Sequence, residues 1–415
     1  MYVETLPWQV NYDEAEVPPY QLTDPLLCSD GSRVTTLAEW EKKRRPELLQ
    51  FFKDYMYGDV PPLPDRMTGE LYSEKKGDLG GLADRKEIRL HFAMENGKSH
   101  FADLLIYTPA NAGKKVPFFV GLAFKGNQVA VCDPEIRLTG LAFFDEAADP
   151  AAAAEESRGS STERYPLREI ISRGYGIVIC SCNDFFPDYL TGWEKSMYRL
   201  FFETEELQNG HRPGNYTCIG AWAWGLSRIL DYVQTLPELD AGKVAVYGHS
   251  RLGKTALWAG ACDERFKLVC VNDSGCGGAA LSRRLFGETL YSFFYKHDLG
   301  KWWFRPELAA LSLHPEKLPF DQHELVALIA PRAVSIHSAV EDLWADPKGE
   351  YLAGYYAGEV FKLYGKNPLQ SAELPSPDRG VGTDVSYFLR SGGHNILLPD
   401  WNHYMDIADL VFGKK

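Results

Sequence analysis

The 415-residue chain lacks the features of several specialised protein classes. Its longest apolar runs, such as 176–180 and 325–330, fall far short of the roughly 20 residues that a membrane-spanning helix needs. Its eight cysteines are too few for a disulfide scaffold, and the Cys-Ser-Cys sequence at 180–182 lacks the two-residue spacer of a zinc or thioredoxin motif. We therefore expect neither a membrane span nor a bound metal.

Positive charge is also scarce. The chain has 44 Lys and Arg residues against 57 Asp and Glu residues, so its formal net charge is −13. A protein that binds nucleic acid or an anionic membrane needs clustered basic side chains to offset phosphate repulsion. The first eight residues contain neither the basic nor the apolar segment of a signal peptide. We expect no nucleic-acid partner, no membrane partner and no signal peptide in this chain.

Strand-like and helical patterns alternate over most of the sequence. Apolar residues make up 45% of the chain, which is enough for a large core. We predict strands at 116–123, 176–181, 243–247, 268–272, 333–338 and 384–389, with helices at 220–235 and 349–364 between them. This alternation predicts a mainly parallel central sheet with helices on both faces, which is a three-layer αβα sandwich.

The N-terminal part has a different pattern. Residues 1–80 are rich in proline and turn signals, and we predict that they form an extension packed on a catalytic domain of residues 81–415. Alternating runs at 85–93 and 100–107 flank an Asn-Gly turn, so they predict an antiparallel hairpin at the edge of the sheet. The span 133–169, with its Ala-rich stretch, is interpreted as an insertion or a mobile loop.

A glycine-bounded serine follows one of the predicted strands. Residues 248–254 read Gly-His-Ser-Arg-Leu-Gly-Lys and lead into a helical pattern of small residues. A strand, a serine between glycines and a helix form the nucleophile elbow of α/β-hydrolases, in which a strained turn exposes the serine hydroxyl above the sheet. We therefore predict an α/β-hydrolase fold with Ser250 as its nucleophile. The alternative is a serine that caps an ordinary turn between a strand and a helix.

The general base is expected late in the chain. In this fold the acid and the histidine follow the serine in chain order, each on a loop after a late strand. His394 follows the predicted strand at 384–389 and two glycines, which free the backbone to turn the imidazole toward Ser250. We predict that His394 activates the serine and later protonates the leaving alcohol. His403, near the start of the last helix, is interpreted as structural.

Three carboxylates are candidates for the triad acid. Asp342 and Glu341 follow the predicted strand at 333–338, which is the usual position of the third triad member, but they cannot both face the histidine. Asp273 directly follows the predicted strand at 268–272, from which a carboxylate can also reach the imidazole. We rank Asp342 and Asp273 ahead of Glu341.

Basic residues surround the predicted nucleophile. The backbone N–H of Arg251 is the expected oxyanion donor, because the developing negative charge needs a preorganised partner. Arg251 and Lys254 place two cations within about one helical turn of the serine. With Arg283 and Arg284 they predict a positive pocket that suits a substrate with a carboxylate. The alternative for Lys254 is a surface ion pair with a nearby carboxylate.

These motifs resemble the glucuronoyl esterases of carbohydrate esterase family 15. The family's elbow reads Gly-x-Ser-Arg-x-Gly-Lys, and 248–254 matches it, including the second glycine three residues after the serine. The segment 272–284 resembles the family's Ser-Gly-x-Gly-Gly block, and 341–347 and 392–394 are similar to bacterial members. The resemblance covers the chain from roughly 116 to 401.

The resemblance implies a specific reaction. It implies a serine esterase that cleaves the ester between 4-O-methyl-glucuronic acid on xylan and an alcohol of lignin through an acyl-enzyme, without a cofactor. It further implies that Arg251 supports the oxyanion, that Lys254 binds sugar hydroxyls, and that Glu288 and Trp344 hold the sugar.

Family members differ at two positions that matter here. Fungal relatives place a Glu where this chain has Asp273, whereas other members take the acid from the loop that contains Asp342. Fungal members also have a cysteine before the serine, tied by a disulfide to a cysteine near the catalytic histidine. This chain has His249 before the serine. The resemblance therefore implies that this disulfide is absent.

Two other functions stay open on the sequence. An acetyl-xylan esterase, or another carbohydrate serine esterase of the same fold, needs no basic pair beside the serine. A catalytically silent carbohydrate-binding protein of this fold needs no triad. Biomass-degrading relatives are exported, so the resemblance implies a secreted or periplasmic protein, and we expect a monomer whose partner is a glucuronate ester of xylan or of a lignin–carbohydrate complex.

Overall fold

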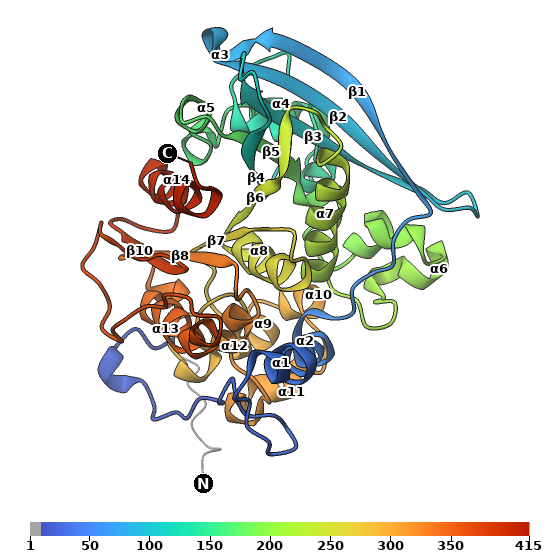
Figure 1. The fold of residues 1–415 in the computed structure, drawn as a ribbon. Coiled ribbons are helices and arrows are strands. Elements are labelled where there is room, and N and C mark those ends of the chain that lie inside the picture. Colours follow the sequence, from blue (N-terminus) through green and yellow to red (C-terminus); the bar gives the residue numbers. More distant parts are fainter. Residues whose placement is uncertain (1–9, 415) are drawn as a thin grey trace. The chain divides into compact units, whose positions relative to one another are not determined.

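The computed structural model describes residues 10–414 (Figure 1). These residues form two compact units. The first unit runs from the described N-terminus to Asp59 and also contains Gly248–Glu264 and Leu268–Asn395. The second unit contains Val60–Tyr247, Arg265–Lys267 and the described residues from Ile396 onward. No helix within residues 10–414 is long and apolar enough to cross a membrane.

The second unit is built on six neighbouring strands. Their order is β1 (Arg66–Gly77), β2 (Ala83–Ala93), β3 (Ser99–Pro109), β5 (Gly176–Ser181), β4 (Val116–Ala123) and β6 (Leu239–His249). The pairs β1–β2, β2–β3 and β3–β5 are antiparallel, whereas β4 is parallel to both β5 and β6. The helices are α3 (Asp78–Gly81), α4 (Pro150–Glu156), α5 (Leu167–Ser172), α6 (Thr204–Leu207), α7 (Cys218–Val233) and α14 (Leu398–Phe412).

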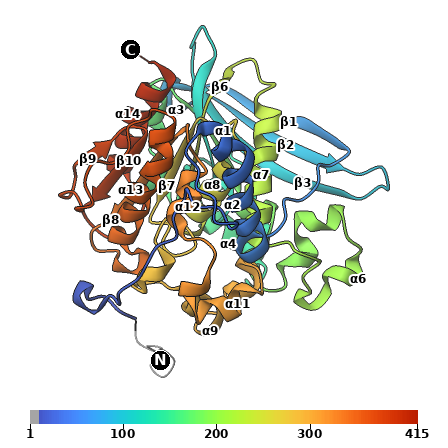
Figure 2. The same cartoon turned by 60° about the horizontal axis from the view of Figure 1, so that its bottom comes forward.

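The first unit contains the remaining strands. Strands β7 (Leu268–Asn272), β8 (Ala333–Ala339) and β10 (Val385–Arg390) are parallel, and β9 (Gly380–Gly382) pairs antiparallel with β10. The helices are α1 (Leu37–Glu39), α2 (Arg45–Phe52), α8 (Arg251–Cys262), α9 (Leu290–Tyr295), α10 (Gly300–Trp303), α11 (Leu308–Ser312), α12 (Gln322–Ala327) and α13 (Pro347–Leu363). Helix α13 packs on β8 and β10, and α12 packs on α13 and α2 (Figure 2).

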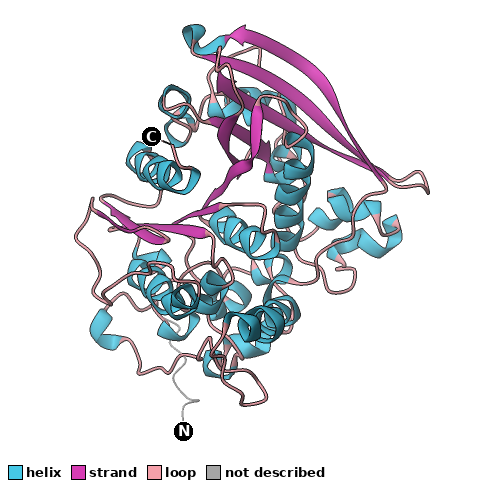
Figure 3. Ribbon diagram, viewed as in Figure 1, coloured by secondary structure: helices cyan, strands magenta, loops and turns pink. Residues whose placement is uncertain are grey.

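The alternation of strands and helices predicted between residues 116 and 389 is confirmed (Figure 3). Each predicted strand and helix is present, with ends that differ by at most a few residues. Strands β5, β7, β8 and β10 are buried along their whole length. Burial of this kind means that both faces of these strands are covered, as expected for the parallel part of a sheet. The antiparallel strands β1 to β3 and β9 make the strand arrangement mixed.

The hairpin predicted from 85–93 and 100–107 is present as β2 and β3, but its predicted place at the sheet edge is wrong. Strand β1 pairs with β2 over most of its length and takes the edge. The side chains of β1 are exposed or half-buried throughout, so no alternation of apolar and polar residues marks this strand in the sequence. A strand with two solvated faces therefore escaped the prediction.

The span 133–169, interpreted as an insertion or a mobile loop, is folded. It contains α4 and the first turn of α5. Asp149 begins α4 by accepting hydrogen bonds from the N–H groups of Ala151 and Ala152. The N–H of Gly159 donates to the Gln128 carbonyl at 2.9 Å, which ties the segment to the helical turn Asn127–Ala130 that follows β4.

Candidate active site

Ser250 lies on a strained turn between β6 and α8. Its backbone has φ 57° and ψ −130°, a conformation that side-chain-bearing residues rarely adopt. A Cβ on Gly248 would lie 1.9 Å from the Leu252 carbonyl oxygen, so the strand can meet the helix this closely only with glycine there. A Cβ on Gly253 would lie 3.1 Å from the Asn272 carbonyl oxygen. The second glycine therefore serves the approach of α8 to the end of β7.

Ser250 opens into a cavity of about 410 Å³ within the first unit. Of the residues predicted for the site, all but Glu341, Arg283 and Arg284 line it: Ser250, Arg251, Lys254, Asp273, Glu288, Asp342, Trp344 and His394. These residues come from five places in the chain, namely the start of α8, the end of β7, the segment before α9, and the loops after β8 and β10. The fold thus gathers residues that are up to 144 positions apart, from 250 to 394.

His394 is bonded to one of the three candidate acids. Its Nδ1 lies 2.6 Å from Oδ2 of Asp342, whose side chain is 5% exposed. Because the histidine Nδ1–H is held by a carboxylate, Nε2 is left as the proton acceptor. Glu341 is exposed, and its backbone N–H donates to the Gly392 carbonyl at 3.0 Å. Asp342 and His394 therefore form the pair that a serine nucleophile needs.

Asp273 is directed at backbone groups. It has a positive φ of 43°, and its side chain is fully buried. Its Oδ1 accepts the Ala339 N–H at 2.7 Å, and its Oδ2 accepts the Asn395 N–H at 3.3 Å. An oxygen of Asp273, an oxygen of Asp342 and a ring nitrogen of His394 all lie within 4.8 Å of one another. Asp273 thus places a second carboxylate beside the imidazole.

Lys254 pairs with a carboxylate, but the lysine is buried and its partner Glu288 is half-buried. Its Nζ donates to Glu288 Oε2 at 2.7 Å, to the Ser274 carbonyl at 2.6 Å and to the Cys276 carbonyl at 2.7 Å. An ammonium group has three donors, so these contacts use all of them. The Trp344 Nε1–H donates to Glu288 Oε1 at 3.3 Å. Lysine, glutamate and tryptophan therefore form one connected wall of the cavity.

The predicted cluster of four cations is only half present. Arg283 and Arg284 are buried and do not line the cavity. Arg283 pairs with Asp321 at 3.2 Å, and Arg284 pairs with Asp346 at 2.9 Å. The expectation that both arginines face the site is wrong, because each one compensates a buried carboxylate elsewhere in the first unit.

Aromatic side chains complete the cavity. Trp303 is 3% exposed and lines it, and the Arg251 guanidinium lies 5.2 Å from the centre of the Trp303 ring. The His297 ring packs edge-on against Trp344 with 5.7 Å between the ring centres. His249, the residue before Ser250, packs against His394 with 4.4 Å between the ring centres and the rings tilted by 43°. The His394 imidazole is therefore supported by a second imidazole.

Sequence reasoning missed a buried carboxyl group beneath the site. Glu350, in the first turn of α13, accepts hydrogen bonds from the N–H and the hydroxyl of Ser274, from the Gly275 N–H and from the Ser338 hydroxyl. Burial raises the pKa of Glu350 to about 7. A Glu in the first turn of a helix is ordinary, so the sequence carried no signal for this role.

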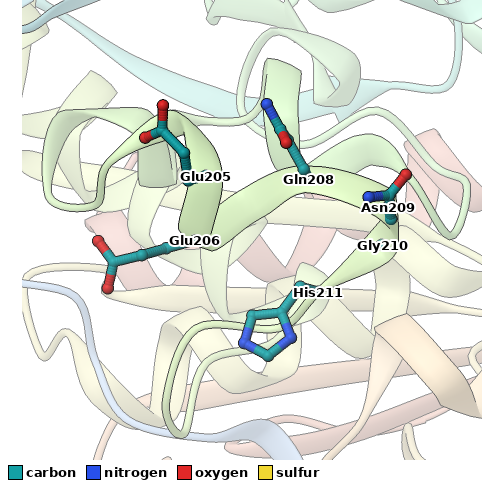
Figure 4. A pocket seen from close by; sticks show the side chains of 6 residues that line it. All are labelled: Glu205, Glu206, Gln208, Asn209, Gly210 and His211. Carbon is teal, nitrogen blue, oxygen red and sulfur yellow. The ribbon is translucent and has the colours of Figure 1, made fainter.

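A second cavity, of about 560 Å³, lies in the second unit along α6 and the loop after it (Figure 4). It is lined by Glu205, Glu206, Gln208, Asn209, Gly210 and His211. Figure 4 shows that these side chains point in different directions and do not converge. The cavity therefore contains no arrangement of acid, base and nucleophile.

Comparison with known proteins identifies relatives of this chain. A family model described as "Glucuronyl esterase, fungi" matches residues 206–365. The chain is 42% identical over 406 residues to Carbohydrate esterase MZ0003 from an unknown prokaryotic organism, covering 96% of this chain and 91% of that protein. It is 26% identical to a 4-O-methyl-glucuronoyl methylesterase of Schizophyllum commune, covering 83% and 74%.

The fold is shared with solved relatives. The glucuronoyl esterase from Solibacter usitatus superposes with a TM-score of 0.87 at 36% identity, covering 96% of this chain and 100% of that one. The predicted α/β-hydrolase fold and the resemblance of the motifs are both confirmed. The chain belongs to the glucuronoyl esterases of carbohydrate esterase family 15.

Proposed function

We propose that the protein hydrolyses the ester between (4-O-methyl-)glucuronic acid on xylan and an alcohol of lignin. The observation that carries this proposal is the strained Ser250 in the same cavity as the bonded pair His394 and Asp342. A strained serine beside an imidazole held by a carboxylate is the arrangement for acyl transfer. A catalytically silent protein has no need of it.

In the first step Ser250 Oγ attacks the C6 carbonyl carbon of the uronate ester while Nε2 of His394 takes the hydroxyl proton. The Arg251 N–H, at the start of α8, donates to the oxyanion, and the nearby guanidinium adds positive charge. The ester C–O bond then breaks, and the imidazolium returns the proton to the departing alcohol. Asp342 stabilises the imidazolium through its bond to Nδ1.

In the second step the sugar is bound to Ser250 as an acyl ester. His394 takes a proton from a water molecule, whose oxygen attacks the acyl carbon. The bond to Ser250 Oγ then breaks, Oγ takes the proton back from the imidazolium, and the uronate leaves with its carboxylate. We assign the wall formed by Lys254, Glu288 and Trp344 to the sugar hydroxyls and the pyranose face. Because Lys254 already donates three hydrogen bonds, we propose that the oxygens of Glu288 and the ring of Trp344 meet the sugar, with Lys254 holding Glu288 in place.

Paired substrates test this function. We expect the protein to hydrolyse benzyl glucuronate with a much higher kcat/KM than benzyl acetate, and Ser250→Ala to lose about 10⁴-fold or more of the glucuronate activity. Preference for acetate, or for acetylated xylan, would assign the protein to another carbohydrate esterase activity on the same fold. Full activity of the Ser250→Ala variant would contradict the nucleophile itself. We further propose that the enzyme acts as a monomer outside the cytoplasm, where its polymeric substrate is found.

A further inference from the structure

A buried arginine holds the backbone on both sides of the base. Arg390, the last residue of β10, is 3% exposed. Its guanidinium donates to the carbonyls of Ser391 at 2.8 Å, Gly393 at 2.7 Å and Asn395 at 2.8 Å. Gly393 and Asn395 are the residues before and after His394, so a single side chain fixes the carbonyl groups that flank the base.

Asp273 lies against the same arginine. Its Oδ2 is 4.0 Å from Arg390 Nη2 and accepts the N–H of Asn395, while its Oδ1 accepts the N–H of Ala339 at the end of β8. Ala339 precedes Asp342 by three residues. The buried pair of Arg390 and Asp273 therefore joins the loop that carries the base to the strand end from which the triad acid projects.

Packing alone does not hold the base in place. The His394 side chain is 41% exposed, and a Cβ on Gly393 would meet no described atom within 4 Å. Gly392 adopts a φ of +98°, which only glycine reaches easily. A loop with two glycines and an exposed tip is conformationally free unless polar contacts order it. Arg390 and Asp273 supply those contacts.

We propose that Arg390 and Asp273 are positioning residues that act as one unit, here called the clamp. The clamp sets the place of His394 relative to Ser250 and Asp342. The electrostatic effects of its positive and negative charges on the His394 imidazole offset each other. This inference rests on the proposed function of the site, since it assigns a role in presenting the base of that reaction. Neither residue needs to touch the substrate.

The charges around His394 predict a diagnostic signature. The elements packed around His394, or across the cavity from it, carry the following titratable and charged groups: Asp342, Glu341, Asp273, Arg390, Asp378, His249, Arg251, Lys254, Glu288 and His297. Removing the clamp arginine leaves the Asp273 carboxylate uncompensated beside the imidazole, which favours the protonated base. Removing the Asp273 carboxylate leaves the Arg390 guanidinium, whose positive charge disfavours the protonated form of the base. In the pH profile of kcat/KM, the rise on the acid side, here called the acid limb, reports protonation of the base. The two variants must therefore move this limb in opposite directions.

The experiment compares Arg390→Met, Asp273→Asn and the double variant. For benzyl glucuronate we expect kcat per active serine to fall about 10- to 100-fold with KM changed less than threefold, because the Lys254 and Glu288 wall is untouched. We expect the acid limb to move up by about one pH unit in Arg390→Met and down by about one in Asp273→Asn. The double variant should lose less than the product of the two single losses.

Controls separate positioning from general destabilisation. Arg332 is a matched arginine of the first unit, since it donates to the carbonyls of Gly260, Asp263 and Leu328 and does not line the cavity. Arg332→Met should keep kcat per active serine and the pH profile of the parent. Arg390→Lys, which retains the charge and part of the hydrogen bonding, should recover part of the lost kcat.

A serine-directed fluorophosphonate measures the fraction of enzyme with a reactive serine. The pH dependence of the rate at which this reagent labels Ser250 gives the same acid limb without any ester substrate. If the parent protein hydrolysed no glucuronate ester, the proposed function would be contradicted, but the pH dependence of fluorophosphonate labelling could still be measured. Acid limbs that stay in place, or move in the same direction in the two single variants, would overturn the clamp. If Arg390→Met does not fold, Asp273→Asn alone decides, since its limb must move to lower pH.

Discussion

The elbow that carries Ser250, the proposed nucleophile, and the loop that carries His394, the proposed base, both depend on glycines, but they are held in place by different physics. At the elbow, Gly248 faces a carbonyl oxygen four residues away, and there is no room for a side chain. At the base, Gly393 faces open space, and polar contacts from Arg390 and Asp273 order the chain. The elbow is fixed by steric exclusion among neighbours in sequence. The loop of His394 is fixed by hydrogen bonds to Arg390, at the end of the strand that leads into it, and to Asp273, at the end of another strand.

The largest expected effect concerns the acid that is bonded to the base. Asp342→Ala should lower turnover of a glucuronate ester about 10³- to 10⁴-fold, because the imidazole loses the partner that fixes its tautomer and stabilises its charge. Glu341→Ala, a matched change at the adjacent exposed carboxylate, should lose less than threefold. Steady-state kinetics of the two variants checks this prediction. Comparable losses in both would remove Asp342 from the triad.

The two glycines offer a direct contrast in stability. Gly248→Ala should destabilise the protein by about 3 kcal/mol, because the new methyl group meets the Leu252 carbonyl oxygen of the backbone. Gly393→Ala should change the free energy of unfolding by less than about 0.5 kcal/mol. Denaturant unfolding of both variants measures the difference. Equal destabilisation would mean that the loop of the base is packed as tightly as the elbow.

The wall of the cavity should affect substrate choice. Lys254→Met removes the ion pair with Glu288 and two carbonyl contacts, so we expect kcat/KM for a glucuronate ester to fall about 10- to 100-fold. Activity on 4-nitrophenyl acetate, which has no sugar to bind, should fall much less. An equal loss on both substrates would show that Lys254 supports the elbow and not the sugar.

The smallest expected effect is a pH dependence of stability. Burial raises the pKa of Glu350 from 4.5 to about 7, so the folded protein keeps a proton that the unfolded chain loses above pH 4.5. Its contribution to stability is present below pH 4.5 and is lost as the pH rises to about 7. Glu350→Gln cannot lose a proton, so its Tm should fall less than that of the parent over this range, by about 2–4 °C.

Asp184 and Asp346, whose pKa values burial raises to about 7 and about 6, titrate in both proteins over that range and cancel in the difference. Identical pH dependence of Tm in the parent and in the Glu350→Gln variant would contradict a protonated Glu350.

The contrast between the two regions also explains what the sequence could predict. The strand, the glycines and the serine of the elbow are contiguous, and the contacts that require them lie within residues 248–274. Their roles could therefore be predicted from spacing. The strands of the parallel core were predictable for a similar reason, because burial on both faces leaves continuous apolar runs.

The triad acid could not be chosen in that way. Strands β7 and β8 are parallel neighbours, with Asn272 beside His337, so the carboxylates that follow them emerge at the same edge. Which one reaches His394 depends on the positive φ of Asp273 and on the N–H groups that this carboxylate meets. Those partners are 66 and 122 residues away in the sequence. Glu350 escaped prediction for the same reason, since its partners Ser274, Gly275 and Ser338 are set by tertiary packing.

The central claim is that Ser250 forms a covalent ester with the uronate during turnover. Mass spectrometry of the enzyme, quenched with acid while it turns over benzyl glucuronate, tests this claim directly. We predict a glucuronoyl adduct on the peptide that contains Ser250, more abundant at early times than after the substrate is exhausted. Turnover of the ester with no adduct on Ser250, or with the adduct on another residue, would contradict the account.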